Sequence, residues 1–207
     1  MMLGNPTAGT LADRLIPARG TMANPLVRDS ALILVGTAFM ALLAQISIPL
    51  PFSPIPITGQ TLGVYLIGAL YGPRLGALTL LAYLAEGMLG LPVFALGRSA
   101  WSPSSVPGLP VFLGPTAGYL LAFPLAAFVV GLLANRGWDR RVRTAIPAML
   151  TGELIILALG FVWLVAATAL LSGGASLGEL AAIAVFPFLP GTAVKIVVAA
   201  LALPGGW

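Results

Sequence analysis

The chain lacks two residue types that carry much of protein chemistry: none of its 207 residues is a cysteine or a histidine. Without cysteine there is no disulfide framework and no thiolate chemistry. Without histidine the commonest metal ligand and the usual general base at neutral pH are both missing. The composition therefore disfavours a zinc site, a haem site and a nucleophile paired with histidine. We expect no catalytic residues, no metal and no cofactor.

Charge is also scarce. Only 8% of the residues are charged and 59% are hydrophobic, whereas soluble domains carry about 25% charged residues. Ten basic residues against six acidic ones give a net charge of +4. The arginines fall between apolar segments instead of lining one polar face, so we expect surrounding membrane lipid and no nucleic-acid partner.

A membrane-spanning helix needs about 20 apolar residues, and somewhat shorter spans are tolerated. Six candidate spans lie at roughly 31–48, 57–72, 75–91, 112–134, 145–172 and 180–203. Within the last, Pro190 suits a first helical turn, so the continuous helix is expected to begin there. The sequence predicts an all-α integral membrane protein with six transmembrane helices. Residues 1–28 are expected to form a flexible cytoplasmic tail, and 29–207 the six-helix membrane domain.

The arginines predict the orientation. Eight of them precede the first span, separate the second from the third, or separate the fourth from the fifth: Arg14, Arg19, Arg28, Arg74, Arg136, Arg140, Arg141 and Arg143. All these positions lie on one side, and the positive-inside rule makes that side, with both termini, cytoplasmic. The Pro/Gly-rich loops at 49–58 and 92–115 then face outward.

The chain's one lysine, Lys195, lies inside the apolar run "FLPGTAVKIVVAALAL". Insertion of a lysine at membrane depth costs roughly 2.5–3.5 kcal/mol. Its amine either reaches for the membrane surface, pairs with Glu153 or Glu86, or contacts a ligand. We favour the last, because intramembrane charges usually mark a substrate path. Thr192, three residues earlier, lies on the same helical face.

Other candidate ligand contacts are weaker. Gln60, in "ITGQTLGVY", either faces a cavity or caps a helix after the Pro-rich loop. Arg98 either meets a carboxylate at the mouth of a site or is solvated. Glu153 is either a partner contact or an internal hydrogen-bonding group. Four aromatic residues either line a pocket or belong to core packing and the interfacial belt: Tyr83, Phe94, Trp101 and Tyr119.

Two further features concern partners. Thr37 and Ala41 in the first span form a pair of small residues four apart, which permits close docking of another membrane helix. The nucleotide-binding pattern G-x-x-x-x-G-K-[ST] is absent from the sequence. If transport is driven by ATP, a separate subunit has to hydrolyse it.

Three blocks resemble the BioY family: "PFSPIPITGQTLGVYLIGALYGPRLGALTLLAYLAEGMLGLPVFA", "LGPTAGYLLAFPLAAFVVGLLANRG" and "FPFLPGTAVK". The resemblance covers most of 31–203 and leaves the N-terminal tail outside. It implies a plasma-membrane subunit, not an enzyme, that captures biotin from the outer face. Such an S component works with an energy-coupling transmembrane subunit and two ABC ATPase subunits. Alternatives are another vitamin on the same architecture, or a passive facilitator.

The chain departs from the family in two places. The long loop reads "LGRSAW" instead of the Gly-rich form with an asparagine of some family members, and the last helix differs at one position. The family pattern P-G-D-x-x-K stands here as "PGTAVK", so the lysine carries over to Lys195 and Thr192 replaces the aspartate. The resemblance implies that this aspartate accepts from the ureido N–H groups of biotin. It also implies that Lys195 or Arg98 meets the biotin carboxylate.

Overall fold

The computed structural model describes residues 10–12, 24–172 and 176–207. Within them, five helical stretches are long and apolar enough to cross a membrane, one fewer than the six expected spans. The longer elements are α2 (Pro25–Gln45), α3 (Gln60–Met88), α4 (Ala117–Asn135), α5 (Val142–Ser172), α6 (Leu177–Ala184) and α7 (Leu189–Ala202). Two short strands, β1 (Ser47–Ile48) and β2 (Ile57–Thr58), pair antiparallel and close the Pro-rich loop between α2 and α3.

The first helix, α2, lies several residues nearer the N-terminus than the expected span at 31–48. The Asn24 side chain accepts a hydrogen bond from the Leu26 N–H, and Pro25 occupies the first helical position. Both residues are typical of a helix start. The helix ends at Gln45 because Ser47 and Ile48 pair with β2 instead.

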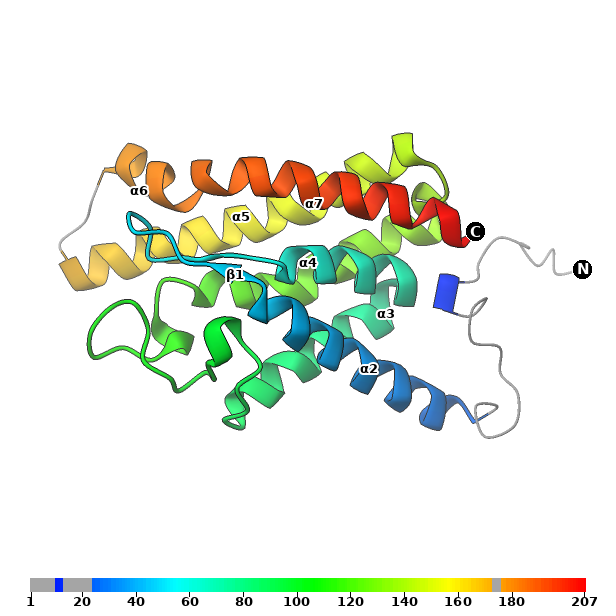
Figure 1. Ribbon diagram of the computed structural model, residues 1–207, viewed down its shortest axis with the longest axis horizontal. Coiled ribbons are helices and arrows are strands. Elements are labelled where there is room, and N and C mark those ends of the chain that lie inside the picture. Colours follow the sequence, from blue (N-terminus) through cyan, green and yellow to red (C-terminus); the bar gives the residue numbers. More distant parts are fainter. Residues whose placement is uncertain (1–9, 13–23, 173–175) are drawn as a thin grey trace, which may run out of the picture.

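Helix α3, which counts as one of the five stretches, reverses direction in its middle. Gly72 has φ 77° and ψ −179°, outside the helical region, and Pro73 follows it. A Cβ placed on Gly76 would lie 3.2 Å from the Gly68 Cα, although eight residues of straight helix cover about 12 Å. The segments 60–71 and 73–88 are therefore two arms folded against each other, as Figure 1 shows. They match the second and third expected spans.

Helix α4 packs against this reversal through small residues. A Cβ on Gly131 would lie 2.5 Å from the Gly72 carbonyl carbon and from the Pro73 nitrogen, and one on Gly68 would lie 2.6 Å from the Ala127 carbonyl oxygen. Only residues without large side chains allow backbones to approach this closely. The contact fixes α4 on the arms of α3.

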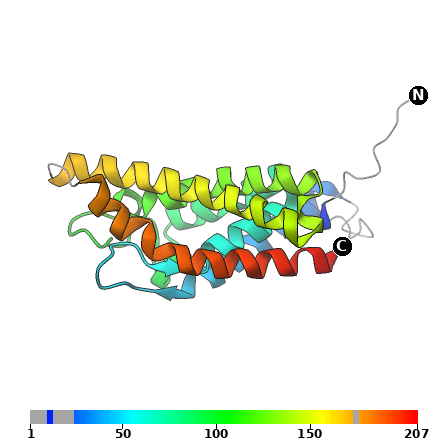
Figure 2. The same cartoon turned by 90° about the horizontal axis from the view of Figure 1, so that it is seen from above.

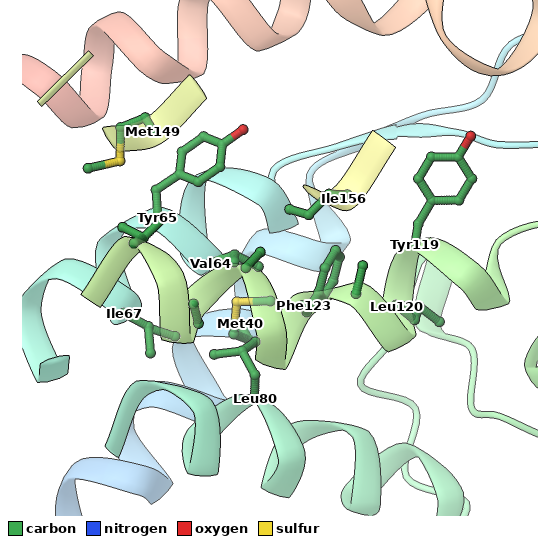
Figure 3. Packing of buried hydrophobic residues seen from close by; sticks show 14 of the residues in the cluster. Met40, Val64, Tyr65, Ile67, Leu80, Tyr119, Leu120, Phe123, Met149 and Ile156 are labelled. Carbon is green, nitrogen blue, oxygen red and sulfur yellow. The ribbon is translucent and has the colours of Figure 1, made fainter. Parts of the chain in front are cut away.

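The core forms where α2, α3, α4 and α5 meet, and Figure 3 shows its centre. Its largest fully buried side chains include Met40, Tyr65, Leu80 and Met149. In contrast, Leu, Val and Phe side chains are widely exposed on the outer faces of the helices. This distribution suits a lipid-facing surface, because lipid tails solvate apolar side chains.

The two residues of the expected docking pair on α2 differ, since Thr37 is buried and Ala41 is partly exposed. Thr37 is only 2% exposed, and a Cβ on the adjacent Gly36 would lie 2.5 Å from the Thr79 methyl group of α3. The small residues let α3 of the same chain approach, which corrects the expected surface contact at Thr37. Ala41 is partly exposed, and the outer face of α2 carries Leu34 and Leu42.

The last expected span, 180–203, is divided into two helices. Helix α6 starts with a reciprocal cap between Ser176 and Glu179 and ends before Pro187, which lies in the 3-10 turn Phe186–Phe188. Helix α7 begins at Leu189 with Pro190 in its first turn, as the sequence predicts. In Figures 1 and 2, α7 runs beside α5 for most of its length.

The ends of the bundle differ in character. The start of α2 and the C-terminus lie at one end, and both long loops lie at the other together with α6 (Figure 1).

At the C-terminal end, the Trp207 indole donates to Asp139 Oδ2 at 2.8 Å, and the Arg140 guanidinium lies 4.3 Å from the centre of the same ring. Burial raises the pKa of the Asp139 carboxyl, and the Trp207 hydrogen bond opposes that rise.

The expected tail, 1–28, falls largely outside the described residues. Leu11 and Ala12, which are described, are buried. Residues from Asn24 onward already belong to the cap and first turn of α2.

Candidate functional site

A cavity lies at the loop end of the bundle. Its volume is about 90 Å³, it opens to the outside of the bundle, and it is lined by both loops, α3, α4, α5, α7 and the turn before α7. A concave site with mostly apolar walls is typical of small-molecule binding. The segments that line it are far apart in the sequence, so the site exists only once the bundle is folded.

Lys195 lines this cavity from α7. Its Nζ donates to the Thr61 hydroxyl at 2.6 Å and to the Thr58 carbonyl oxygen at 3.3 Å. Among the described residues its hydrogen-bond partners are thus neutral oxygens of the β2–α3 segment, and not Glu153 or Glu86. These partners hold the amine at the wall of the cavity.

Glu153 lines the cavity from α5 and is only 4% exposed. Its Oε2 accepts a hydrogen bond from the Tyr65 hydroxyl, and its Oε1 accepts one from the Thr192 hydroxyl at 2.5 Å. Thr192 itself is buried and is not among the lining residues. The structure therefore directs Thr192 toward Glu153. The sequence left the role of Glu153 open, although a carboxylate within an apolar span is itself a functional signal.

Gln60 and Tyr83 form a connected pair. Gln60 lines the cavity, and its Nε2 donates to the Tyr83 hydroxyl at 2.9 Å. The Tyr83 hydroxyl in turn donates to the Val93 carbonyl oxygen at 2.8 Å, and Tyr83 lies behind the lining. The Gln60 N–H also donates to the Thr58 hydroxyl at 3.3 Å. Gln60 thus combines both expected placements, at a helix start and on a cavity wall.

Aromatic residues supply the apolar walls. Phe94 and Tyr119 both line the cavity. The Phe94 ring meets Tyr83 edge-on at 5.4 Å between centroids, and Tyr119 lies 6.3 Å from Phe188. Figure 3 shows the Tyr119 hydroxyl directed toward the same side of the core as that of Tyr65.

Trp101 lies elsewhere. It is 58% exposed, its Nε1 donates to the Met88 carbonyl oxygen at 2.7 Å, and it is not among the residues that line the cavity. This geometry anchors the long loop to the end of α3. An exposed tryptophan at this level also suits the membrane interface.

The long loop after α3 brings Arg98 to the cavity wall. Gln45 at the end of α2 holds this loop twice: its Nε2 donates to the Phe94 carbonyl oxygen at 3.2 Å, and its Oε1 accepts from the Gly97 N–H at 2.9 Å. Arg98 is therefore positioned by a loop that is fastened to a helix.

The two loops are also fastened to each other and to α6. The Ser105 hydroxyl of the long loop donates to the Pro54 carbonyl oxygen at 3.0 Å. The Ser53 hydroxyl donates to the Ile183 carbonyl oxygen of α6 at 2.6 Å. Together the loops cover a site with apolar walls and a few convergent polar groups, which is typical of small-molecule binding.

Comparisons with known proteins agree on one family: the model of the BioY family matches residues 14–207. This chain belongs to the BioY family. The match begins within the N-terminal tail, which the sequence resemblance had left outside. Among relatives of the family, the chain is 43% identical over 162 residues to the biotin transporter BioY of Rhodobacter capsulatus, covering 75% of this chain and 80% of the relative.

More distant relatives agree. The chain is 38% identical over 137 residues to a probable biotin transporter BioY of Pyrococcus horikoshii, covering 66% of this chain and 74% of that one. It is also similar to a crystal structure, at 2.1 Å, of the S-component for biotin from an ECF-type ABC transporter. There the TM-score is 0.69 at 26% identity, over 88% of this chain and 92% of the other. The BioY-family chain is thus a multi-pass membrane protein.

The predicted binding residues of this BioY-family protein divide into two groups. Those that line the cavity are Lys195, Arg98, Gln60, Phe94 and Tyr119. The remaining three support or surround it: Thr192 contacts Glu153, Tyr83 contacts Gln60, and Trp101 anchors the loop. Ligand contact by any of these residues stays a prediction.

Proposed function

We propose that this chain is the substrate-capture subunit, or S component, of an energy-coupling-factor ABC transporter and that it takes up biotin. The observation that carries the proposal is the cavity at the loop end, where apolar walls from Phe94 and Tyr119 meet the partly buried amine of Lys195. Biotin combines an apolar bicycle and chain with a ureido group and a carboxylate. The names of the relatives support the same ligand.

The ligand has one preferred orientation in this cavity. The ureido group lies at the buried end, near Lys195, and the carboxylate lies toward Arg98 on the loop. A charged carboxylate costs less near water than in the protein interior, and the loop is the part of the site nearest the outside. The bicycle and chain then lie along the aromatic wall.

The proposed topology has six spans with both termini in the cytoplasm. The two arms of α3 count as two crossings, since Gly72 and Pro73 reverse the chain between them. An even number of crossings is supported by the start of α2 and the C-terminus lying at one end of the bundle (Figure 1). Arg74 and the basic residues of 136–143 belong to connections at that end, which the positive-inside rule places in the cytoplasm.

Transport needs partners that this chain does not supply. The proposal includes an energy-coupling transmembrane subunit and two ABC ATPase subunits, because the sequence has no nucleotide-binding loop. The chain itself acts as a binding protein and not as an enzyme. The outer face of α2, with Leu34 and Leu42 exposed, is available to lipid or to a partner helix.

The test is a calorimetric titration of biotin into the purified chain in detergent, with thiamine and riboflavin as controls. We expect tight binding of one biotin per chain and no binding of the controls. A folded chain that binds one of the other vitamins instead would keep the architecture and change the ligand. Solute flux through vesicles that contain only this chain would overturn the capture function in favour of a passive facilitator.

A further inference from the structure

Glu153 is a buried carboxylate at the wall of the cavity. It projects from the middle of the apolar helix α5, is 4% exposed, and lines the cavity together with Lys195. Burying a carboxylate is costly unless hydrogen bonds compensate it. The site thus contains a carboxylate whose burial costs free energy, at the place where a ligand would lie.

Within the described parts of the chain, hydrogen bonds use only part of the accepting capacity of the two Glu153 oxygens. Oε2 accepts from the Tyr65 hydroxyl and Oε1 from the Thr192 hydroxyl. An ionised carboxylate accepts at about four lone-pair sites, so each oxygen keeps capacity for one more donor. Because Glu153 lines the cavity, a ligand bound there could donate hydrogen bonds to these free lone pairs.

The carboxylate is also held in place. Tyr65 comes from α3, Thr192 from α7 and Glu153 itself from α5, so three helices fix its position. A group oriented in this way binds with less loss of side-chain freedom than one on a flexible loop. The two Glu153 oxygens thus form a rigid pair of acceptors for hydrogen-bond donors of a ligand.

We propose that Glu153 accepts the ureido N–H groups of the ligand, with Tyr65 and Thr192 as positioning residues; this rests on biotin being the ligand. A urea carries N–H donors on both sides of its carbonyl group. A carboxylate is a strong acceptor for such donors, and hydrogen bonds to an ionised group are roughly twice as strong as neutral ones. The Lys195 amine, on the same cavity, suits the ureido carbonyl oxygen as a donor.

The proposal gives Thr192 a definite role. Its hydroxyl donates to Glu153 and therefore orients the acceptor without contacting the ligand. The carboxylate that the sequence lacks at position 192 is supplied from α5 at position 153. Specificity for the ureido group then depends on Glu153 and not on the "PGTAVK" segment.

The test compares Glu153→Gln with the wild type in titrations with biotin and with biotin methylated on a ureido nitrogen. Glutamine keeps the shape but loses the charged acceptor, so biotin affinity falls about tenfold or more. Methylation removes one N–H donor. In the wild type, methylation lowers biotin affinity strongly. In the glutamine variant it lowers affinity by a smaller factor, because the charged acceptor for that N–H group is already absent.

Glu86→Gln is the matched control. Glu86 is a partly exposed carboxylate on α3 that is not among the lining residues, and its variant is expected to bind both ligands like the wild type. If Glu153→Gln does not fold, Glu153→Asp is measured instead. It keeps the charge but retracts the oxygens, and is expected to bind biotin more weakly.

Two outcomes would overturn the role of Glu153: biotin affinity that is unchanged in the variant that folds, or a methylation penalty that is equal in the wild type and the glutamine variant. Failure of the proposed function is a different result, because the wild type itself would then not bind biotin.

Discussion

The amine of Lys195 lies among oxygens that the protein supplies from the segment after the Pro-rich loop. The two groups that accept its hydrogen bonds, the Thr61 hydroxyl and the Thr58 carbonyl group, are both uncharged. Neutral oxygens orient an ammonium group without neutralising it. The amine therefore keeps the capacity to attract a carbonyl or carboxylate oxygen of a ligand.

Replacing Lys195 with alanine should weaken biotin binding at least tenfold, or about 1.4 kcal/mol, with no loss of folded protein. The reason is the loss of a charged donor at the buried end of the cavity. Calorimetric titration of the purified variant measures the effect. Arg74→Ala is the control, since Arg74 is exposed and lies at the turn between the α3 arms. Wild-type affinity in Lys195→Ala would remove the lysine from the site.

At this scale the sequence identifies candidates better than it identifies contacts. Lys195 stands out because a charged side chain in an apolar run usually marks a substrate path, and it lines the cavity. Gln60, for which the sequence leaves helix capping equally open, lines it too. Thr192 shares a helical face with Lys195, but spacing does not reveal that a buried Glu153 on another helix captures its hydroxyl. Trp101 is a residue type that often lines pockets, yet its indole N–H donates to the Met88 carbonyl oxygen at the end of α3.

Among the helices, α4 approaches the α3 reversal through backbone contacts. Gly131 faces backbone atoms of Gly72 and Pro73 and not flexible side chains. Backbone atoms at a turn between two packed arms cannot move aside cheaply. Any side chain at position 131 would push α4 away from both arms of α3.

Gly131→Ala should therefore destabilise the protein by about 1–3 kcal/mol, the usual cost of overpacking. Thermal unfolding in detergent measures this as a lower melting temperature. Gly178→Ala is the matched control: it lies in α6, where an added Cβ meets nothing within 4 Å, and alanine favours a helix. Equal melting temperatures for the two variants would refute the proposed close approach.

Some helix boundaries can be predicted from proline and glycine in the sequence. Pro190 correctly indicates the start of α7, and the residues around Gly72 and Pro73 separate two predicted spans that the structure joins by a sharp turn. The burial of Thr37 on α2 cannot be predicted from the sequence, because small residues permit any close neighbour, and docking of a partner at Ala41 stays a prediction. Nothing in the sequence of α2 says whether that neighbour is a partner or, as here, α3.

For the whole molecule, the absence of cysteine permits a direct test of orientation. Pro107→Cys places a thiol on the exposed long loop, and Gly205→Cys places one near the C-terminus, where an added Cβ has open space. In intact cells, a membrane-impermeant maleimide should label Pro107→Cys alone. Gly205→Cys should react only after the membrane is permeabilised.

The cysteine-free parent is the control for background labelling. Labelling of Gly205→Cys in intact cells would contradict a cytoplasmic C-terminus and, with it, the proposed direction of capture. The arginine pattern makes this orientation the expected one, because most of the basic residues lie at the end of the bundle that holds the C-terminus.

The hydrogen bonds that fasten the two loops have a consequence for access to the cavity. The long loop is bonded to α2 through Gln45, the Pro-rich loop to α6 through Ser53, and the loops to each other through Ser105. Since both loops line one cavity, widening its mouth requires several of these bonds to break together. The loops are thereby coupled to α2 and α6, so a motion of either helix would change access to the cavity.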